Sequence, residues 1–233
     1  HPHTSLQTVS WLFDGEIEHR DSGGVHDLVR PGEVNLMTSG RGISHSEVTT
    51  RQTGYLHGVQ LWVVLPEHAK DVARGFQHHR PDVVDIPGGT ARVMVGELAG
   101  ASSPIVTETR LLGAEVILRP GAEWEFEVEA GFEHGLLVDI GAGEMDGGLI
   151  EKDAMGVRDA GLGHLRLHNP TDRDARLMLL GGEPFEEGIV MWWNFIGRSH
   201  EEIVELREAW QAGDERFGDV RGYTGATRRL EAP

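Results

Sequence analysis

The sequence contains no cysteine among its 233 residues. Disulfide bonds and thiolate metal ligands are therefore excluded. A metal ion would have to be bound by imidazole nitrogens and carboxylate oxygens, which suit iron, manganese, nickel, cobalt, copper or zinc. Since disulfides are typical of oxidising compartments, their exclusion favours a cytoplasmic location, which we expect for this protein.

Basic residues and long apolar runs are also scarce. Lysine and arginine number 21 against 38 aspartate and glutamate residues, which gives a formal net charge of −17. Such a chain lacks the basic face that phosphate backbones require, so we expect no direct contact with nucleic acid. No apolar run approaches the roughly 18 residues that span a bilayer, so we expect no membrane segment.

Glycine, in contrast, is abundant at 32 residues, and turn residues separate many short apolar runs. Many short strands at such spacing predict an all-β fold of barrels or sandwiches. The predicted strands include Gln7–Phe13, Val34–Met37, Val59–Leu65, Arg92–Val95, Glu115–Leu118, Glu125–Val128, Leu136–Ile140 and Leu177–Leu180.

A weak internal repeat indicates two related β modules in tandem. Leu12–Glu16 resembles Ile140–Glu144, and Arg30-Pro31-Gly32 resembles Arg119-Pro120-Gly121. The small residues at 100–104 have the character of a linker. We therefore expect a first module over residues 1–100, a second over 105–190, and a C-terminal arm over 191–233.

One segment of that arm has the pattern of a helix. Ser199 and Glu202 form a capping box, in which each side chain accepts a hydrogen bond from a free backbone amide. Ile203, Leu206 and Trp210 then recur on one face. A helix over 199–212 that packs near the first module is predicted.

Two pairs of side chains are candidate metal ligands. His1 and His3 are two residues apart, as are His45 and Glu47. In a strand, such residues point to the same face. Two such strands side by side would bring three imidazoles and one carboxylate to one point, close to the facial arrangement of non-haem iron oxygenases.

The residues around these pairs resemble the pirin family along nearly the whole chain. The similar segments are His1-Pro2-His3 with Gln7-Thr8-Val9, Gly15–Ser22, Arg30–Val34, Met37–Glu47, Gly58–Pro66 and Leu180–Pro184. The resemblance implies a bicupin, that is, two tandem cupin β-barrels followed by a C-terminal α-helix. It also implies one divalent metal, usually iron, in the first barrel. Matched residue by residue, the implied ligands are His1, His3, His45 and Glu47.

The sequence departs from the family pattern at three places. Ser5 and Leu6 replace the usual glycine and aromatic residue, and Gln7 replaces the usual glutamate. The family also carries sequence before the H-P-H motif. We therefore expect that the upstream strands of the first barrel lie outside this sequence.

The second module lacks the ligand pattern. In the repeat, Glu129 and Gly131 occupy the positions of His1 and His3, and His134, His164 and His168 are not paired two residues apart. A barrel without metal is expected there. His19 stands between charged neighbours and is expected to be solvated.

Three functions remain open at this point. The first, implied by the quercetin-cleaving bacterial pirins, is a dioxygenase acting on a flavonol and O2 with Fe(II), in which Glu47 is both a ligand and the catalytic base. The second, implied by an animal pirin, is a non-catalytic metal or redox sensor that binds a protein partner. The third, a copper site built on the amine and imidazole of an N-terminal His1, conflicts with Pro2 and with the pirin motifs.

Overall fold

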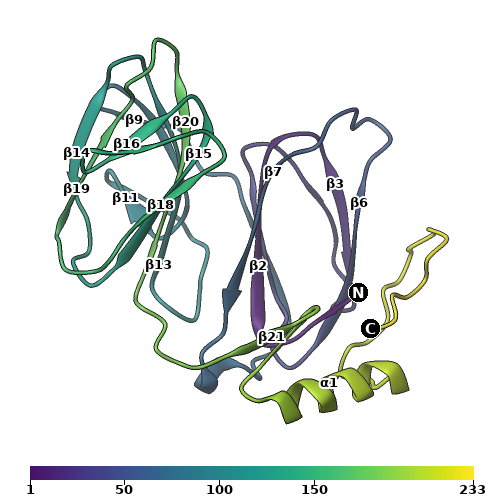
Figure 1. Cartoon of the computed structure of the whole chain (residues 1–233). Coiled ribbons are helices and arrows are strands. Elements are labelled where there is room, and N and C mark those ends of the chain that lie inside the picture. The colour runs from purple at the N-terminus through teal and green to yellow at the C-terminus, as the bar shows by residue number, and fades with distance from the viewer. The chain divides into compact units, whose positions relative to one another are not determined.

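The computed structural model describes the whole chain, residues 1–233, and divides into two compact units. The first unit combines residues 1–78 with 186–233, and the second unit is residues 79–185. Strands dominate both units, and one α-helix lies near the C-terminus (Figure 1). The predicted all-β fold of two barrels with a C-terminal helix is therefore confirmed.

Two four-stranded antiparallel sheets form the barrel of the first unit. Their strand orders are β1-β6-β3-β4 and β7-β2-β5-β8. Trp11, Leu36 and Ile43, from three different strands, are fully buried. The strands are β1 (Pro2–His3), β2 (Leu6–Asp14), β3 (Ile17–Asp21), β4 (His26–Val29), β5 (Val34–Thr38), β6 (Ile43–Thr49), β7 (His57–Val64) and β8 (Gly75–His79), with a 3-10 turn η1 (Glu67–Ala69).

The second unit contains a six-stranded sheet, β18-β15-β20-β13-β10-β9, and a four-stranded sheet, β14-β19-β16-β17. Its core is built of leucine and valine side chains such as Val116, Leu136 and Leu177. The strands are β9 (Val84–Ile86), β10 (Gly89–Val95), β11 (Glu97–Leu98), β12 (Ala101–Ser102), β13 (Leu111–Leu118), β14 (Glu123–Glu127), β15 (Glu133–Ile140), β16 (Gly143–Met145), β17 (Gly148–Ile150), β18 (Met155–Arg158), β19 (His164–His168) and β20 (Ala175–Gly182).

The repeated Arg-Pro-Gly sequence forms the same turn in both units. The amide of Glu33 donates to the carbonyl of Arg30 at 3.2 Å, and the amide of Ala122 donates to the carbonyl of Arg119 at 3.0 Å. Gly32 and Gly121 have φ of 74° and 67°. Proline followed by a residue of positive φ is typical of a type II turn, which explains the repeated tripeptide.

The boundary between the units lies earlier than residues 100–104. The small residues there form a hairpin turn, since Leu98 pairs with Ala101 in the β11–β12 hairpin. Ala99 and Gly100 have φ of 53° and 79°, which is the backbone of a tight two-residue turn. β10, which precedes this hairpin, already pairs with β13 of the second unit. The composition of a tight turn was thus mistaken for that of a linker.

The predicted helix is present as α1 (His200–Ala212), and it packs within the first unit. The Ser199 side chain accepts from the Glu202 amide, and the Glu202 carboxylate accepts from the Arg198 amide at 2.6 Å. Ile203 and Trp210 are buried in a cluster with Phe195 of β22 (Phe195–Gly197), which pairs with β21 (Val190–Trp192). No helix in the chain combines the length and apolar character needed to cross a bilayer.

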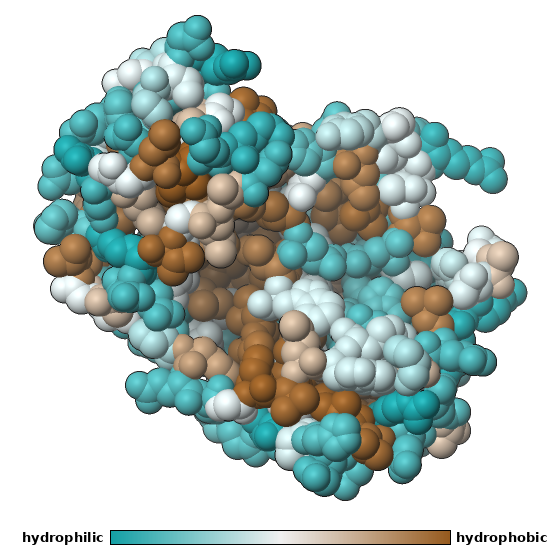
Figure 2. All heavy atoms as spheres, viewed as in Figure 1, coloured by the Kyte–Doolittle hydropathy of each residue, from teal (hydrophilic) through white to brown (hydrophobic).

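Apolar side chains are exposed close to this helix. Ile189 and Met191 are among the large apolar residues that remain accessible. Figure 2 shows apolar surface gathered where Figure 1 places β21 and the start of α1. Because folded proteins commonly expose apolar atoms, this patch by itself identifies no partner.

Removal of the helix cap should destabilise α1. We expect Ser199→Ala to lower the free energy of opening of the α1 amides by about 1 kcal/mol, since one amide loses its acceptor. Hydrogen exchange of the α1 amides measures this change. Glu205→Ala, an exposed change within the same helix, is the control and should leave exchange nearly unaltered.

Candidate metal centre

Strand pairing in the first unit brings the two predicted ligand pairs together. β1 pairs antiparallel with β6, with His3 opposite Ile43, and the amide of His45 donates to the carbonyl of His1 at 2.9 Å. His1 and His3 on one strand therefore stand beside His45 on the other. Ser5, just after β1, has φ of 58° and holds the left-handed conformation for which the family uses glycine.

The three imidazoles converge through their Nε2 atoms. The Nε2 atom of His45 lies 2.8 Å from that of His1 and 3.0 Å from that of His3. Ligands about 2.0–2.1 Å from a metal and at right angles to each other are about 2.8–3.0 Å apart. The observed spacing therefore fits two adjacent pairs of nitrogen ligands around one octahedral ion.

A backbone carbonyl orients the imidazole of His3. The Nδ1 atom of His3 lies 3.2 Å from the carbonyl oxygen of Asn194, in the turn between β21 and β22. Since a carbonyl only accepts, Nδ1 carries the proton and Nε2 keeps its lone pair. Nδ1 of His45, in contrast, is buried without a hydrogen-bond partner.

Burial keeps these imidazoles neutral. It lowers the pKa of His3 to about 4, a shift that the hydrogen bond to Asn194 only partly opposes. Burial also lowers the pKa of His45 well below its ordinary value, with further contributions from the nearby His3 and His19. Because metals bind the neutral imidazole, the site is ready for a cation at neutral pH.

Glu47 lies next to the histidines but is held by a different partner. Both of its carboxylate oxygens accept from Nε2 of Gln60 on β7 at 2.9 Å, and the same nitrogen donates to the Ser10 hydroxyl at 3.1 Å. Ligand atoms of Glu47, His19 and His45 fall within 4.8 Å of one another. Glu47 is thus close enough to His45 to share an ion, while His1, His3 and His45 form the tighter group.

The structure adds His19, which sequence reasoning placed in solvent. That expectation was wrong, because His19 is only 2% exposed. In β3 the side chains alternate, so His19 and Asp21 point inward while their charged neighbours point outward. His19 lies opposite Glu47 in the register of β3 and β6. The H-x-D spacing was the available signal.

Asp21 fixes the orientation of His19. The Nε2 atom of His19 lies 3.2 Å from Oδ2 of Asp21, whose Oδ1 accepts from the amides of Gly23 and Val25. Burial acts to raise the pKa of Asp21, but these hydrogen bonds outweigh burial and lower it. A carboxylate beside an imidazole is the arrangement that often supports metal-binding histidines from behind.

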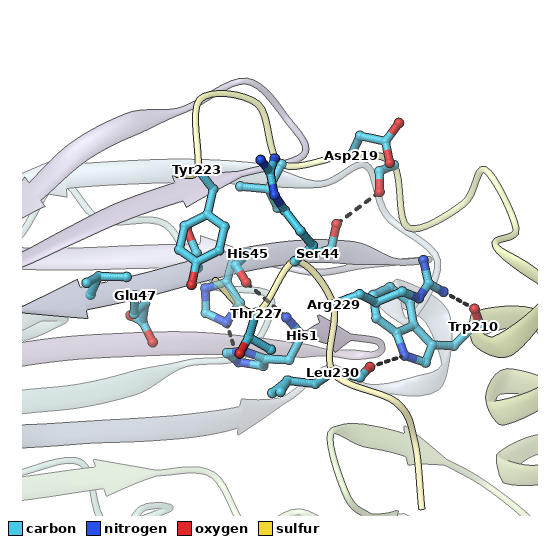
Figure 3. A pocket seen from close by; sticks show the side chains of 15 residues that line it. His1, Ser44, His45, Glu47, Trp210, Asp219, Tyr223, Thr227, Arg229 and Leu230 are labelled. Atoms are coloured by element: carbon cyan, nitrogen blue, oxygen red, sulfur yellow. Dashed lines mark hydrogen bonds between the residues drawn. The ribbon is translucent and has the colours of Figure 1, made fainter. Parts of the chain in front are cut away.

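A pocket of about 450 Å³ opens beside the candidate ligands. Its lining includes His1, His45 and Glu47 together with Tyr223, Thr227 and Leu230 of the C-terminal segment, which are labelled in Figure 3. The Trp210 indole donates to the carbonyl of Leu230 at 2.8 Å, which ties this segment to α1. A small organic molecule could therefore reach the candidate ligands.

The histidines noted in the second unit are dispersed. His164 is exposed, His168 lies 3.0 Å from the Glu144 carboxylate, and His134 is buried at the end of the barrel. Glu129 pairs instead with Arg110 at 2.8 Å.

Comparisons with known proteins identify the family that this chain resembles. The Pirin family matches residues 1–63, and the Pirin C-terminal cupin domain matches residues 113–218. A Pseudomonas aeruginosa protein, provisionally named a quercetin 2,3-dioxygenase, is 40% identical over 235 residues, covering 100% of this chain and 73% of its own. Human pirin is 31% identical over 213 residues, covering 88% of this chain and 73% of its own.

Solved structures give the same result. The crystal structure of quercetin 2,3-dioxygenase from Acinetobacter baumannii superposes with a TM-score of 0.92 at 39% identity, covering 100% of this chain and 77% of that one. The family implies a divalent metal, and the imidazoles of the first unit are donors of the type it needs. Both modules, the fold and the level of identity agree, and the chain belongs to the pirin family.

Proposed function

We propose that this chain is a metal-dependent dioxygenase of the quercetin 2,3-dioxygenase type, acting on a flavonol and O2. The observation that carries the proposal is the convergence of three imidazoles, with a carboxylate beside them, at an accessible pocket. The similarity to quercetin 2,3-dioxygenases, at 40% identity for one relative and 39% for a solved structure, supports it.

We assign His1, His3, His45 and Glu47 as the ligands of one divalent ion, with Fe(II) as the preferred metal. A bound divalent ion would supply Lewis-acid activation of the flavonol hydroxyl and a site for dioxygen. Imidazole and carboxylate ligands suit iron, nickel, cobalt and manganese alike, so the metal has to be identified by loading.

Glu47 is the residue placed to accept the proton of the flavonol 3-hydroxyl. Its carboxylate borders the pocket and lies beside the imidazole of His45. Gln60 donates to both of its oxygens and so fixes the plane of the carboxylate. A positioned base of this kind contributes typically 10²–10⁴-fold to a rate.

The test of the function is the loss of quercetin absorbance in air with iron-, nickel-, cobalt- or manganese-loaded protein. Turnover above that of the free metal is expected with at least one of these ions. If none of them supports turnover, the metal- or redox-sensing regulator becomes the better assignment.

Metal content should depend on His3. We expect His3→Ala to lower metal affinity about tenfold or more, because one oriented nitrogen ligand is lost. Elemental analysis should give one ion per wild-type chain and much less for the variant. His68→Ala removes an exposed imidazole of the same unit and should keep full occupancy. Full occupancy in His3→Ala would contradict the ligand assignment.

Glu47→Gln should separate the two roles of Glu47. An amide oxygen still ligates weakly but accepts no proton, so we expect turnover per bound metal to fall on the order of 100-fold. Quercetin turnover divided by measured metal content gives this ratio. Unchanged turnover per metal would rule out Glu47 as the base while leaving the dioxygenase proposal in place.

The metal-free protein should lose stability in acid. The pKa of His3 is about 4 in the folded chain and 6.5 in the unfolded chain. Between these two pH values, His3 is therefore protonated in the unfolded chain but neutral in the folded chain. The free energy of unfolding should therefore fall by up to roughly 3 kcal/mol between pH 6.5 and 4 and level off below.

Urea unfolding of the metal-free wild-type protein and of the metal-free His3→Gln variant across this pH range measures how much His3 contributes to the pH dependence of stability. Glutamine does not titrate, so the variant should show a shallower decline. Parallel curves for the two proteins would mean that His3 titrates normally.

A further inference from the structure

The second unit contains a cavity of about 790 Å³ that is separate from the candidate metal centre. It lies where β13 and β15 begin and β14 ends, and all of its lining residues fall between Gly96 and His134. Cavities of about 300–1,000 Å³ are the size that commonly accommodates small organic ligands.

One buried side chain at this cavity has unmet hydrogen-bonding capacity. His134 lines the cavity and is 1% exposed, and neither Nδ1 nor Nε2 makes a hydrogen bond of ordinary geometry, although the Phe132 backbone lies close enough to raise its pKa. On β15 it alternates with Leu136 and Val138, so it stands on the strand face that forms the core. A buried polar group without full hydrogen bonding is unfavourable, and it calls for an explanation.

The neighbouring strand leaves room for this imidazole. His134 lies opposite Gly181 of β20, where a Cβ atom would come within 3.1 Å of Cδ2 of His134. Burial, and then the charge of Arg158, lower the pKa of His134, against smaller opposing contributions from the Phe132 backbone and Asp146. The imidazole is therefore neutral at pH 7 and offers one donor and one acceptor.

Part of the cavity wall is apolar and could contact an aromatic ring, while polar groups make up the larger share of the lining. The lining includes four buried apolar side chains, Leu98, Ile105, Leu112 and Phe132. The guanidinium of Arg110 lies 5.2 Å from the centre of the Phe132 ring.

The charges at the cavity disfavour an anion. Arg110 is already paired with Glu129 at 2.8 Å and with Glu183 at 3.5 Å. The lining also contains Glu97, Glu108 and Glu127. A neutral ligand is thus favoured over a carboxylate or a phosphate.

We propose that this cavity is a second binding site, specific for a small neutral phenol. The phenol hydroxyl both donates to and accepts from groups at the buried end, with His134 as its principal partner. The aromatic ring lies against Phe132, Leu112 and Ile105. This site needs no metal and is independent of the dioxygenase assignment.

Calorimetric titration of the metal-loaded protein with 2-naphthol at pH 7 tests the proposal. Wild-type protein should bind the probe, and His134→Leu should weaken binding about tenfold or more, equivalent to about 1.4 kcal/mol. His164→Asn, which alters an exposed histidine of the same unit, and His3→Ala, which alters the candidate metal centre, should both bind as wild type does.

Two further measurements distinguish the loss of a binding contact in His134→Leu from a folding defect of that variant. Ile105→Trp narrows the cavity without touching His134 and should also weaken binding. In wild-type protein, the ¹⁵N resonances of the His134 ring should shift when 2-naphthol is added. Absence of binding to the wild type, full binding to His134→Leu, or loss of binding in His3→Ala would each overturn the proposal.

Discussion

The antiparallel pairing of β1 with β6 is the interaction on which the candidate centre depends. It sets His1 and His3 beside His45, and the next residues of β6 carry Glu47 toward Gln60 of the facing sheet. A shift of this register by one residue would turn both histidines of β1 to the opposite face. The chemistry of the site therefore rests on a strand of two residues, Pro2–His3, and on the contacts that hold it.

Those contacts come largely from the last part of the chain. Thr4 bridges to Phe195 in β22, the carbonyl of Asn194 orients His3, and Phe195 belongs to the same apolar cluster as Trp210 of α1. Burial then shields the imidazoles, lowers their pKa and keeps them neutral. The packing of the C-terminal helix and the orientation of the proposed metal ligands thus depend on the same contacts.

Much of this architecture was predictable from the sequence. Some signals depend only on residues that are close together in the sequence, and such signals can be read before the fold is known. They include the two-residue spacing in His1-Pro2-His3 and in His45-Ser46-Glu47, and the capping box at Ser199. His19 was missed because its charged neighbours outweighed the alternation of its strand. The turn at Ala99-Gly100 was mistaken for a linker because small residues serve both purposes. The burial of His134 beside the cavity could not be predicted, because it depends on residues distant in sequence, such as Gly181.

The contact between His3 and Asn194 also has a consequence for biosynthesis. The two residues are separated by 191 positions, and the whole of the second unit is translated between them. During synthesis His3 is made early, but the carbonyl that orients it is added only after the whole of the second unit has been synthesised. Contacts of such long sequence separation form late. The proposed metal site is therefore expected to be completed only after most of the chain has been made.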